Sequence, residues 1–143
     1  MNRNDAHIEP LDRRHLDAVM ALCRAEGWDS YVEHPEITWR ALTAPGVCTL
    51  VAVEGRDVVG FVQIQSDGVI QAHLSLIVVA PPRRRRGMGR RLIEEALGRA
   101  GAKRIDLLCT ERADGFYRSF EHRTFPGYRI YPRPTARASS SCS

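Results

Sequence analysis

The segment 47–79 constrains the fold most, because it holds three strand-like stretches in a row that are joined by short turns. Residues 47–53, 58–65 and 69–79 are rich in β-branched and other apolar side chains, which is typical of strands. The stretches between them, 54–57 and 66–68, contain the Gly, Asp and Ser of turns. Strands with such short connections run antiparallel, so the segment predicts a three-stranded antiparallel meander.

The periodicity changes after residue 79. Met88, Leu92, Ala96 and Ala100 recur at a spacing of four, which predicts a helix with one apolar face. Residues 105–109 then have the composition of a buried strand. A strand, a helix and a second strand in succession favour parallel pairing of the two strands. The chain is therefore predicted to have an α/β fold of the α+β type, with a mixed but mainly antiparallel central sheet flanked by helices.

The flanking segments extend this pattern at both ends. Residues 8–11 are predicted as a first strand, and Asp12 as the cap of a helix whose apolar face repeats at helical spacing and which ends at Gly27. Pro35 is predicted to begin a second helix that stops at 45–46. Residues 113–120 are predicted as a helix, 124–131 as a last strand and 132–143 as a flexible tail, so that residues 1–131 form one domain.

The composition excludes several classes of protein. The chain has 143 residues, 43% of them hydrophobic, and a net charge of +4, which suits one globular domain. Its longest apolar run, 76–80, is far shorter than the roughly 20 residues that span a bilayer. The four cysteines (Cys23, Cys48, Cys109, Cys142) have no metal-binding spacing. We therefore expect reduced and mostly buried thiols, no metal, no membrane partner and a cytoplasmic location.

An arginine-rich loop between the third strand and the helix is the strongest functional signal. Residues 83–91 contain six arginines and two glycines, Gly87 and Gly89. Cations are unfavourable at the positive end of a helix dipole unless an anion binds there. Glycines let the backbone approach a ligand, and the free N–H groups of a first helical turn bind phosphate oxygens. The pattern favours a pyrophosphate site.

Two other interpretations of the loop are open, a solvated charged surface and a nucleic-acid patch. No Lys-Ser or Lys-Thr follows the glycines, so the loop is not a Walker A motif, and the third glycine of a dinucleotide-binding fingerprint is absent. The arginines also lie in one tight loop without interleaved aromatic residues, which disfavours nucleic-acid binding.

The loop resembles the motif of the GNAT superfamily of N-acetyltransferases, Gln/Arg-x-x-Gly-x-Gly/Ala after a strand that ends in Val-x-Pro. Here Val79-Ala80-Pro81 precede Arg84-Arg85-Arg86-Gly87-Met88-Gly89. The resemblance implies a splayed GNAT-like sheet, acetyl-CoA as co-substrate and, frequently, a homodimer. The cofactor contacts that it implies lie at the end of the third strand, in the loop and after the fifth strand: Ile77, Val78, Val79, Arg84, Arg85, Arg86, Gly87, Met88, Gly89, Arg90 and Thr110.

A second matching element, residues 113–120, looks like the family's Ala-x-x-Phe-Tyr segment. Tyr117 takes the position of the general acid that serves the departing coenzyme A thiolate. A phenol with a pKa near 10 stays protonated at neutral pH and can donate to sulfur. The alternative is a core tyrosine packed beside Phe116. Thr110 and Glu121 depart from the family pattern, since many members have Asn and Gly there.

A general base is predicted on the third strand. Strand alternation places Gln71, His73, Ser75, Ile77 and Val79 on one face. His73 lies six residues before Val79, where the family often has a glutamate or histidine that accepts the amine proton. Neutral imidazole suits that task. The alternative is a hydrogen-bonded histidine with a structural role.

The acceptor is predicted from the segment between the first two helices. Asp29, Glu33 and Glu36 lie near Trp28, Tyr31 and Trp39, which suggests a small-molecule amine. The residues proposed to contact it are Trp28, Asp29, Tyr31, Glu33, Gln71 and Ser75. Alternatively, Trp28 and Tyr31 hold the two helices together, and Arg129 and Arg133 bind an acidic acceptor.

Three functions stay open at this stage. The favoured one is an acetyl-CoA-dependent N-acetyltransferase that works by direct attack of the amine. The second is a coenzyme A-binding module without catalysis, and the third is a basic nucleic-acid binder. A covalent acyl-enzyme at Cys109 is disfavoured, because nothing beside it in the sequence lowers the pKa of its thiol.

Overall fold

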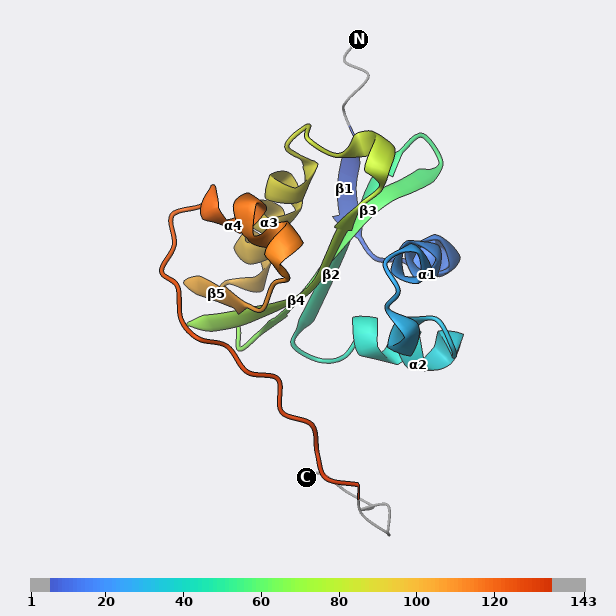
Figure 1. The fold of residues 1–143 in the computed structure, drawn as a ribbon. Helices are drawn as coiled ribbons and strands as arrows, with labels where there is room; N and C mark the ends of the chain where they lie inside the picture. The colour runs from blue at the N-terminus through green and yellow to red at the C-terminus, as the bar shows by residue number, and fades with distance from the viewer. Residues whose placement is uncertain (1–5, 135–143) are drawn as a thin grey trace. The chain divides into compact units, whose positions relative to one another are not determined.

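The computed structural model describes residues 6–134, which divide into two compact units, one up to Leu107 and one from Leu108. The first unit contains all of the strands (Figure 1). Its elements are β1 (His7–Pro10), α1 (Leu16–Ala25), α2 (Pro35–Leu42), β2 (Val47–Glu54), β3 (Asp57–Ser66), β4 (Gln71–Val79), α3 (Met88–Ala100) and β5 (Arg104–Leu107). Three short 3-10 turns complete it: η1 (Arg13–His15), η2 (Asp29–Tyr31) and η3 (Pro81–Arg83).

The five strands form one sheet in the order β1-β2-β3-β4-β5. Neighbouring strands are antiparallel except β4 and β5, which are parallel. This confirms the predicted meander and the predicted parallel pair on either side of α3. The parallel ladder is short, because β5 pairs only with the first four residues of β4, from Gln71 to Leu74.

A register shift in the β3–β4 ladder changes which side chains share a face. Ile64 pairs with Leu74, whereas Gln63 pairs with Leu76. Ser75 is therefore an extra residue on β4, as in a β-bulge, and the alternation of faces is offset beyond it. His73 lies on the same face as its partner Gln65, but Ile77 pairs with Val62 and lies on the opposite face. The prediction that His73, Ile77 and Val79 share a face is wrong for this reason.

Helices α1 and α2 cover one face of the sheet, and α3 covers the other (Figure 1). The predicted apolar face of α1 is buried with Phe61, Leu76 and Val78 of the sheet, and this cluster also includes Leu42 of α2. On the other face, Leu92 of α3 lies 3.5 Å from the place that a Cβ atom on Gly60 would take. Both helices thus pack through the apolar positions that their periodicity marks.

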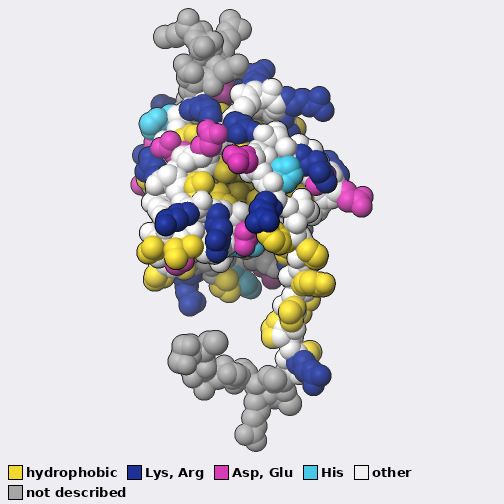
Figure 2. Space-filling view, turned by 90° about the vertical axis from the view of Figure 1, so that its left-hand side faces the viewer, with side chains coloured by type: hydrophobic (Ala, Val, Ile, Leu, Met, Phe, Trp, Pro, Cys, Tyr) yellow, Lys and Arg dark blue, Asp and Glu magenta, His cyan; other side chains and the backbone are white. Residues whose placement is uncertain are grey.

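The second unit contains α4 (Glu111–Arg118) and an extended segment. No strand occurs in residues 121–134, so the strand predicted for 124–131 is wrong. Pro126 and Gly127 interrupt the pattern, and the described part of this unit offers no other strand to pair with. Four apolar side chains of the segment are exposed as a result (Figure 2): Phe125, Tyr128, Ile130 and Tyr131.

Candidate active site

The arginine-rich loop connects the end of β4 to the start of α3 through η3. Two of its residues have left-handed backbone conformations, Arg85 with φ 66° and Gly87 with φ 80°. Gly87 is the N-cap of α3, and no described side chain makes a capping hydrogen bond there or places an acidic group in the first turn. The first turn of this 13-residue helix therefore has no side-chain cap, and the N–H groups of Met88 and Gly89 at its start point in the direction in which helices bind anions. The predicted pyrophosphate site stays a prediction.

The arginine side chains themselves mostly bind the protein. Arg83 makes two hydrogen bonds to the carboxylate of Glu54, at 2.6 and 2.9 Å. Arg84 donates to the carbonyl of Val79 at 2.7 Å and to Glu26 at 2.9 Å. These bonds attach the loop to the β2–β3 hairpin, to the end of β4 and to the end of α1. Arg83 and Arg84 thus hold the loop to the rest of the first unit.

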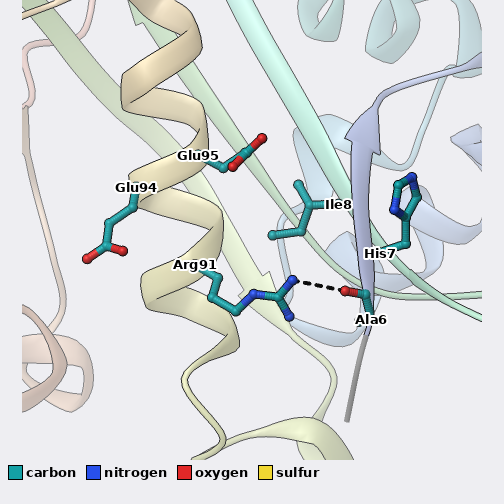
Figure 3. A pocket seen from close by; sticks show the side chains of 6 residues that line it. All are labelled: Ala6, His7, Ile8, Arg91, Glu94 and Glu95. Carbon is teal, nitrogen blue, oxygen red and sulfur yellow. Dashed lines mark hydrogen bonds between the residues drawn. The ribbon is translucent and has the colours of Figure 1, made fainter. Parts of the chain in front are cut away.

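A hollow of about 510 Å³ opens between α3 and β1 (Figure 3). It is lined by Ala6, His7, Ile8, Arg91, Glu94 and Glu95. Arg91 crosses it and donates to the carbonyl of Ala6 at 3.1 Å. Of these residues, only Arg91 belongs to the predicted arginine-rich loop, and none was predicted to contact the cofactor or the acceptor. Two glutamates would also repel an anionic cofactor, so this hollow does not serve the proposed pyrophosphate.

The second half of β4 has an edge that β5 does not occupy. β5 pairs with β4 only up to Leu74. From Ser75 to Val79, β4 is paired with β3 on one side only, and within the described residues no strand lies along its other side. This open edge leads directly to η3 and the arginine-rich loop. An extended group with amide N–H and C=O functions can pair with such an edge while its phosphates reach α3.

Polar side chains surround the bulge on β4. Gln65 of β3 donates to the hydroxyl oxygen of Ser75 at 3.0 Å. His73 pairs in register with Gln65 on one side and Asp106 of β5 on the other, and its side chain is exposed. His73, Gln65 and Ser75 therefore share the face covered by α1 and α2, near the open edge. The predicted roles of His73 and Ser75 stay predictions.

The predicted acceptor residues differ in how far they already interact with other parts of the protein. Trp28 and Tyr31 are half-buried and pack against the core cluster beneath α1, which is the kind of contact that the alternative interpretation expects; their predicted contact with the acceptor stays a prediction. Asp29 and Glu33 are exposed. Glu36 is paired with Arg13, and Gln71 accepts a hydrogen bond from Arg104. The acidic character of this segment is thus partly neutralised by the protein itself.

Tyr117 lies in α4 of the second unit, where its ring contacts Phe116 edge to face at 4.9 Å between centroids. Burial, with a smaller contribution from Cys109, raises the pKa of the Tyr117 phenol to about 12. The phenol is therefore fully protonated at neutral pH. Thr110 is the N-cap residue of α4, but its side chain makes no capping hydrogen bond.

The cysteines follow the prediction only in part. Cys23 is buried, and burial raises the pKa of its thiol to about 11. Cys48 is half-buried, whereas Cys109 is exposed. The prediction of a buried Cys109 is wrong because β5 ends at Leu107, two residues before it. Cys142 lies outside the described residues.

Several residues that interact with the site were not predicted from the sequence. Glu26 and Glu54 bind the loop arginines from distant parts of the chain. Gln63 is buried at 2% exposure in the middle of an otherwise apolar strand pattern. Its unusual polarity there was the one available signal, because a polar residue at a core position requires a partner.

The open edge of β4, followed by a helix that begins at a glycine without a side-chain cap, is the arrangement that the resemblance to acetyltransferases implies. The family model for the acetyltransferase (GNAT) domain matches residues 45–122. The chain belongs to the GNAT acetyltransferase family, and the predicted fold class is confirmed. Members of this family use acetyl-CoA. No curated protein matches the chain.

Solved structures of acetyltransferases have the same fold. A GNAT family protein of Streptococcus pneumoniae is 27% identical, with a TM-score of 0.71 over 90% of this chain and 97% of that one. An acetyltransferase of Trypanosoma brucei is 18% identical, with a TM-score of 0.72 over 90% and 100%. AAC(6')-Iy, solved with the bisubstrate analogue CoA-S-monomethyl-acetylneamine, is 16% identical, with a TM-score of 0.73 over 90% and 98%.

Residues 6–134 contain no helix that is long and apolar enough to cross a membrane. They also contain no cluster of three or more His, Cys, Asp or Glu side chains that could hold a metal ion.

Proposed function

We propose that this chain is an N-acetyltransferase that transfers the acetyl group of acetyl-CoA to the amine of a small-molecule acceptor. The observation that carries the proposal is the continuity of the open β4 edge with the uncapped N-terminus of α3. We further propose that residues 1–131 act as one catalytic domain in the cytoplasm, as a monomer or a homodimer.

The residues present fit acetyl-CoA. In this proposal the backbone of Ile77, Val78 and Val79 pairs with the pantetheine arm. The N–H groups from Arg85 to Gly89 hold the pyrophosphate, since that of Arg84 donates to the carbonyl of Pro81. Arg84, Arg85, Arg86 and Arg90 add positive charge, and Met88 begins the helix. Thr110, whose hydroxyl makes no capping bond, is a further contact. Bound acetyl-CoA supplies the activated acetyl group.

The acid and base are assigned to Tyr117 and His73. The amine nitrogen attacks the thioester carbonyl carbon, a C–N bond forms, and His73 accepts the amine proton directly or through water. The C–S bond breaks, and Tyr117 donates to the departing sulfur. Because the pKa of Tyr117 is about 12 and that of a thiol about 8.5, we expect Tyr117 to stabilise the thiolate by hydrogen bonding.

A coenzyme A-binding module without catalysis remains the second candidate, since the loop and the open edge serve binding alone equally well. A nucleic-acid binder is disfavoured. Arg83 and Arg84 are already paired with Glu54 and Glu26, so their charges are partly compensated within the protein and contribute less to a phosphate-binding surface.

Thermal unfolding with acetyl-CoA, coenzyme A, ATP and duplex DNA tests the proposal. Acetyl-CoA at 100 times its dissociation constant should stabilise the protein by about 2.7 kcal/mol, whereas ATP and DNA should not. An amine panel then measures turnover. Tyr117→Phe should lower kcat about 100-fold or more while acetyl-CoA binding persists. Binding without turnover on any amine would favour the second candidate.

A further inference from the structure

The extended segment of residues 125–131 exposes four large apolar side chains to solvent. Phe125 is 70% exposed, Tyr128 82%, Ile130 88% and Tyr131 75%, and apolar side chains follow one another along this segment (Figure 2). The segment lies outside residues 45–122, which the family model matches. Exposed apolar surface of this extent is typical of a place where another molecule binds.

Within this segment, residues 128–131 have the composition of a strand. Three of the four side chains are aromatic or β-branched, as strands favour. No proline interrupts the run, although Pro126 and Pro132 lie close to its two ends, so each of its N–H groups can donate to a neighbouring strand. Within the described part of the chain no strand lies beside the run. The run therefore has the groups of a strand and lacks an edge to pair with.

The outer edge of β5 is the matching feature in the first unit. β5 is the last strand in the order of the sheet and pairs with β4 alone, so its other edge is free within residues 6–134. It has four residues, as many as the run. Its apolar residues, Ile105 and Leu107, are only half-buried, and a further strand would cover them. An unpaired edge of this kind is a template for a strand of another chain.

The charges favour one register between the run and β5. Asp106 lies between two apolar residues of β5, and Arg129 lies between two apolar residues of the run. Among residues 6–134, neither Asp106 nor Arg129 has an ion-pair partner. Opposite charges on directly paired residues stabilise a sheet. Antiparallel pairing with Arg129 opposite Asp106 also places apolar residues opposite one another, Tyr128 with Leu107 and Ile130 with Ile105.

We propose that two copies of this chain exchange residues 128–131, so that the run of each copy pairs with the outer edge of β5 in the other copy. The exchange is symmetric and closes after two copies. Four large apolar side chains from each copy, at roughly 150 Å² each, can bury about 1,200 Å², and a specific interface needs about 1,000 Å². The run does not pair with β5 of its own chain, and a second copy supplies the same edge. The exchange does not depend on acetyl transfer.

Sedimentation velocity of the full chain gives the first test. The wild type should be a dimer at micromolar concentration. Ile130→Asp should raise the Kd of the dimer about 100-fold or more, because it would bury a carboxylate at both pairings. Ile37→Asp is the matched control, since Ile37 of α2 is also an exposed isoleucine, at 54%, and it should keep the wild-type Kd. A monomeric wild type overturns the proposal, and so do equal effects of the two substitutions.

Charge reversal tests which edge the run pairs with and whether that edge belongs to another copy. Asp106→Arg alone and Arg129→Asp alone each place like charges opposite one another at both pairings, so each should raise the Kd of the dimer about tenfold or more. In an equimolar mixture the two variants are complementary, and heterodimers should form with about the wild-type Kd. Pairing within one chain, or through a different surface, would make mixing without effect, and that result overturns the exchange.

Discussion

The arginine-rich loop of residues 83–91 and the acidic, aromatic segment of residues 28–36 were both predicted to bind ligands from their composition. In the loop, Arg83 and Arg84 bind glutamates of the protein, and the backbone N–H groups of α3 stay available. In the segment, Trp28 and Tyr31 pack into the core. Conspicuous side chains therefore serve the fold in both regions. The helices that follow differ in their first turns: that of α2 contains the acidic Glu36, whereas that of α3 contains no acidic residue.

Replacing Trp28 tests the structural half of this comparison and should have the largest effect. Trp28→Ala removes a half-buried ring from the cluster beneath α1, so we expect the free energy of unfolding to fall by about 2–3 kcal/mol. Acetyl-CoA affinity, corrected for the unfolded fraction, should not change. Urea unfolding and a binding titration measure the two quantities. Asp29→Asn, at the exposed neighbouring position, is the control, and its free energy of unfolding should stay within about 0.5 kcal/mol of the wild type. If Trp28→Ala is instead as stable as the wild type but has a raised KM for the acceptor, Trp28 is a ligand contact.

Removing Arg84 tests whether the loop arginines act through the protein. Arg84→Ala deletes the bonds to Val79 and Glu26 and so loosens the loop. Because binding must then order the loop again, we expect the Kd of acetyl-CoA to rise about tenfold, which corresponds to about 1.4 kcal/mol. Isothermal titration measures this. Glu26→Gln distinguishes the two possible causes. If Arg84 is a tether, Glu26→Gln also weakens binding; if Arg84 contacts the phosphate directly, releasing it from Glu26 strengthens binding.

Elements with local signals were predicted well from the sequence. The helices and the meander were predicted correctly, because their signals come from neighbours in the chain. These signals are the apolar period of α3, the helix cap residues and the turn residues at 54–57 and 66–68. The extra residue at Ser75 was not predictable, because a bulge is defined by the register between two strands. The ion pairs of Glu26 and Glu54 join residues 58 and 29 positions apart, and no local pattern marks them. The predicted strand at 124–131 failed because a strand requires a partner.

Gly87 sharpens the comparison at the level of the backbone. Its φ of 80° is one that L side chains adopt with strain, although no atom lies within 4 Å of an added Cβ. Gly87→Ala should therefore cost about 1 kcal/mol of stability and weaken acetyl-CoA binding. Gly98 is the matched control, since it also has open space around it but lies inside α3 without a positive φ. Gly98→Ala should stabilise the protein by about 0.5–1 kcal/mol. If the two alanine substitutions instead have equal effects on stability, the loop does not depend on the left-handed conformation of Gly87.

The β3–β4 turn offers a third polar loop, one that is ordered by its own carboxylate. Asp67 accepts backbone N–H bonds from Val69 and Ile70, both at 2.7 Å, and from Gln71, and these bonds lower its pKa below the usual value. A lowered pKa in the folded state means that the carboxylate adds stability above its ordinary pKa, near 4, and loses that contribution as the pH falls through the lower folded value. Asp67→Asn should therefore lower the Tm by a few degrees at pH 6, and the difference from the wild type should shrink towards pH 3. Thermal unfolding across this range measures it, with the exposed Asp57→Asn as control. If the difference in Tm between Asp67→Asn and the wild type stays constant with pH, the charge of Asp67 does not order the turn. Of the two loops, only the arginine-rich loop would then rely on charged side chains for its conformation.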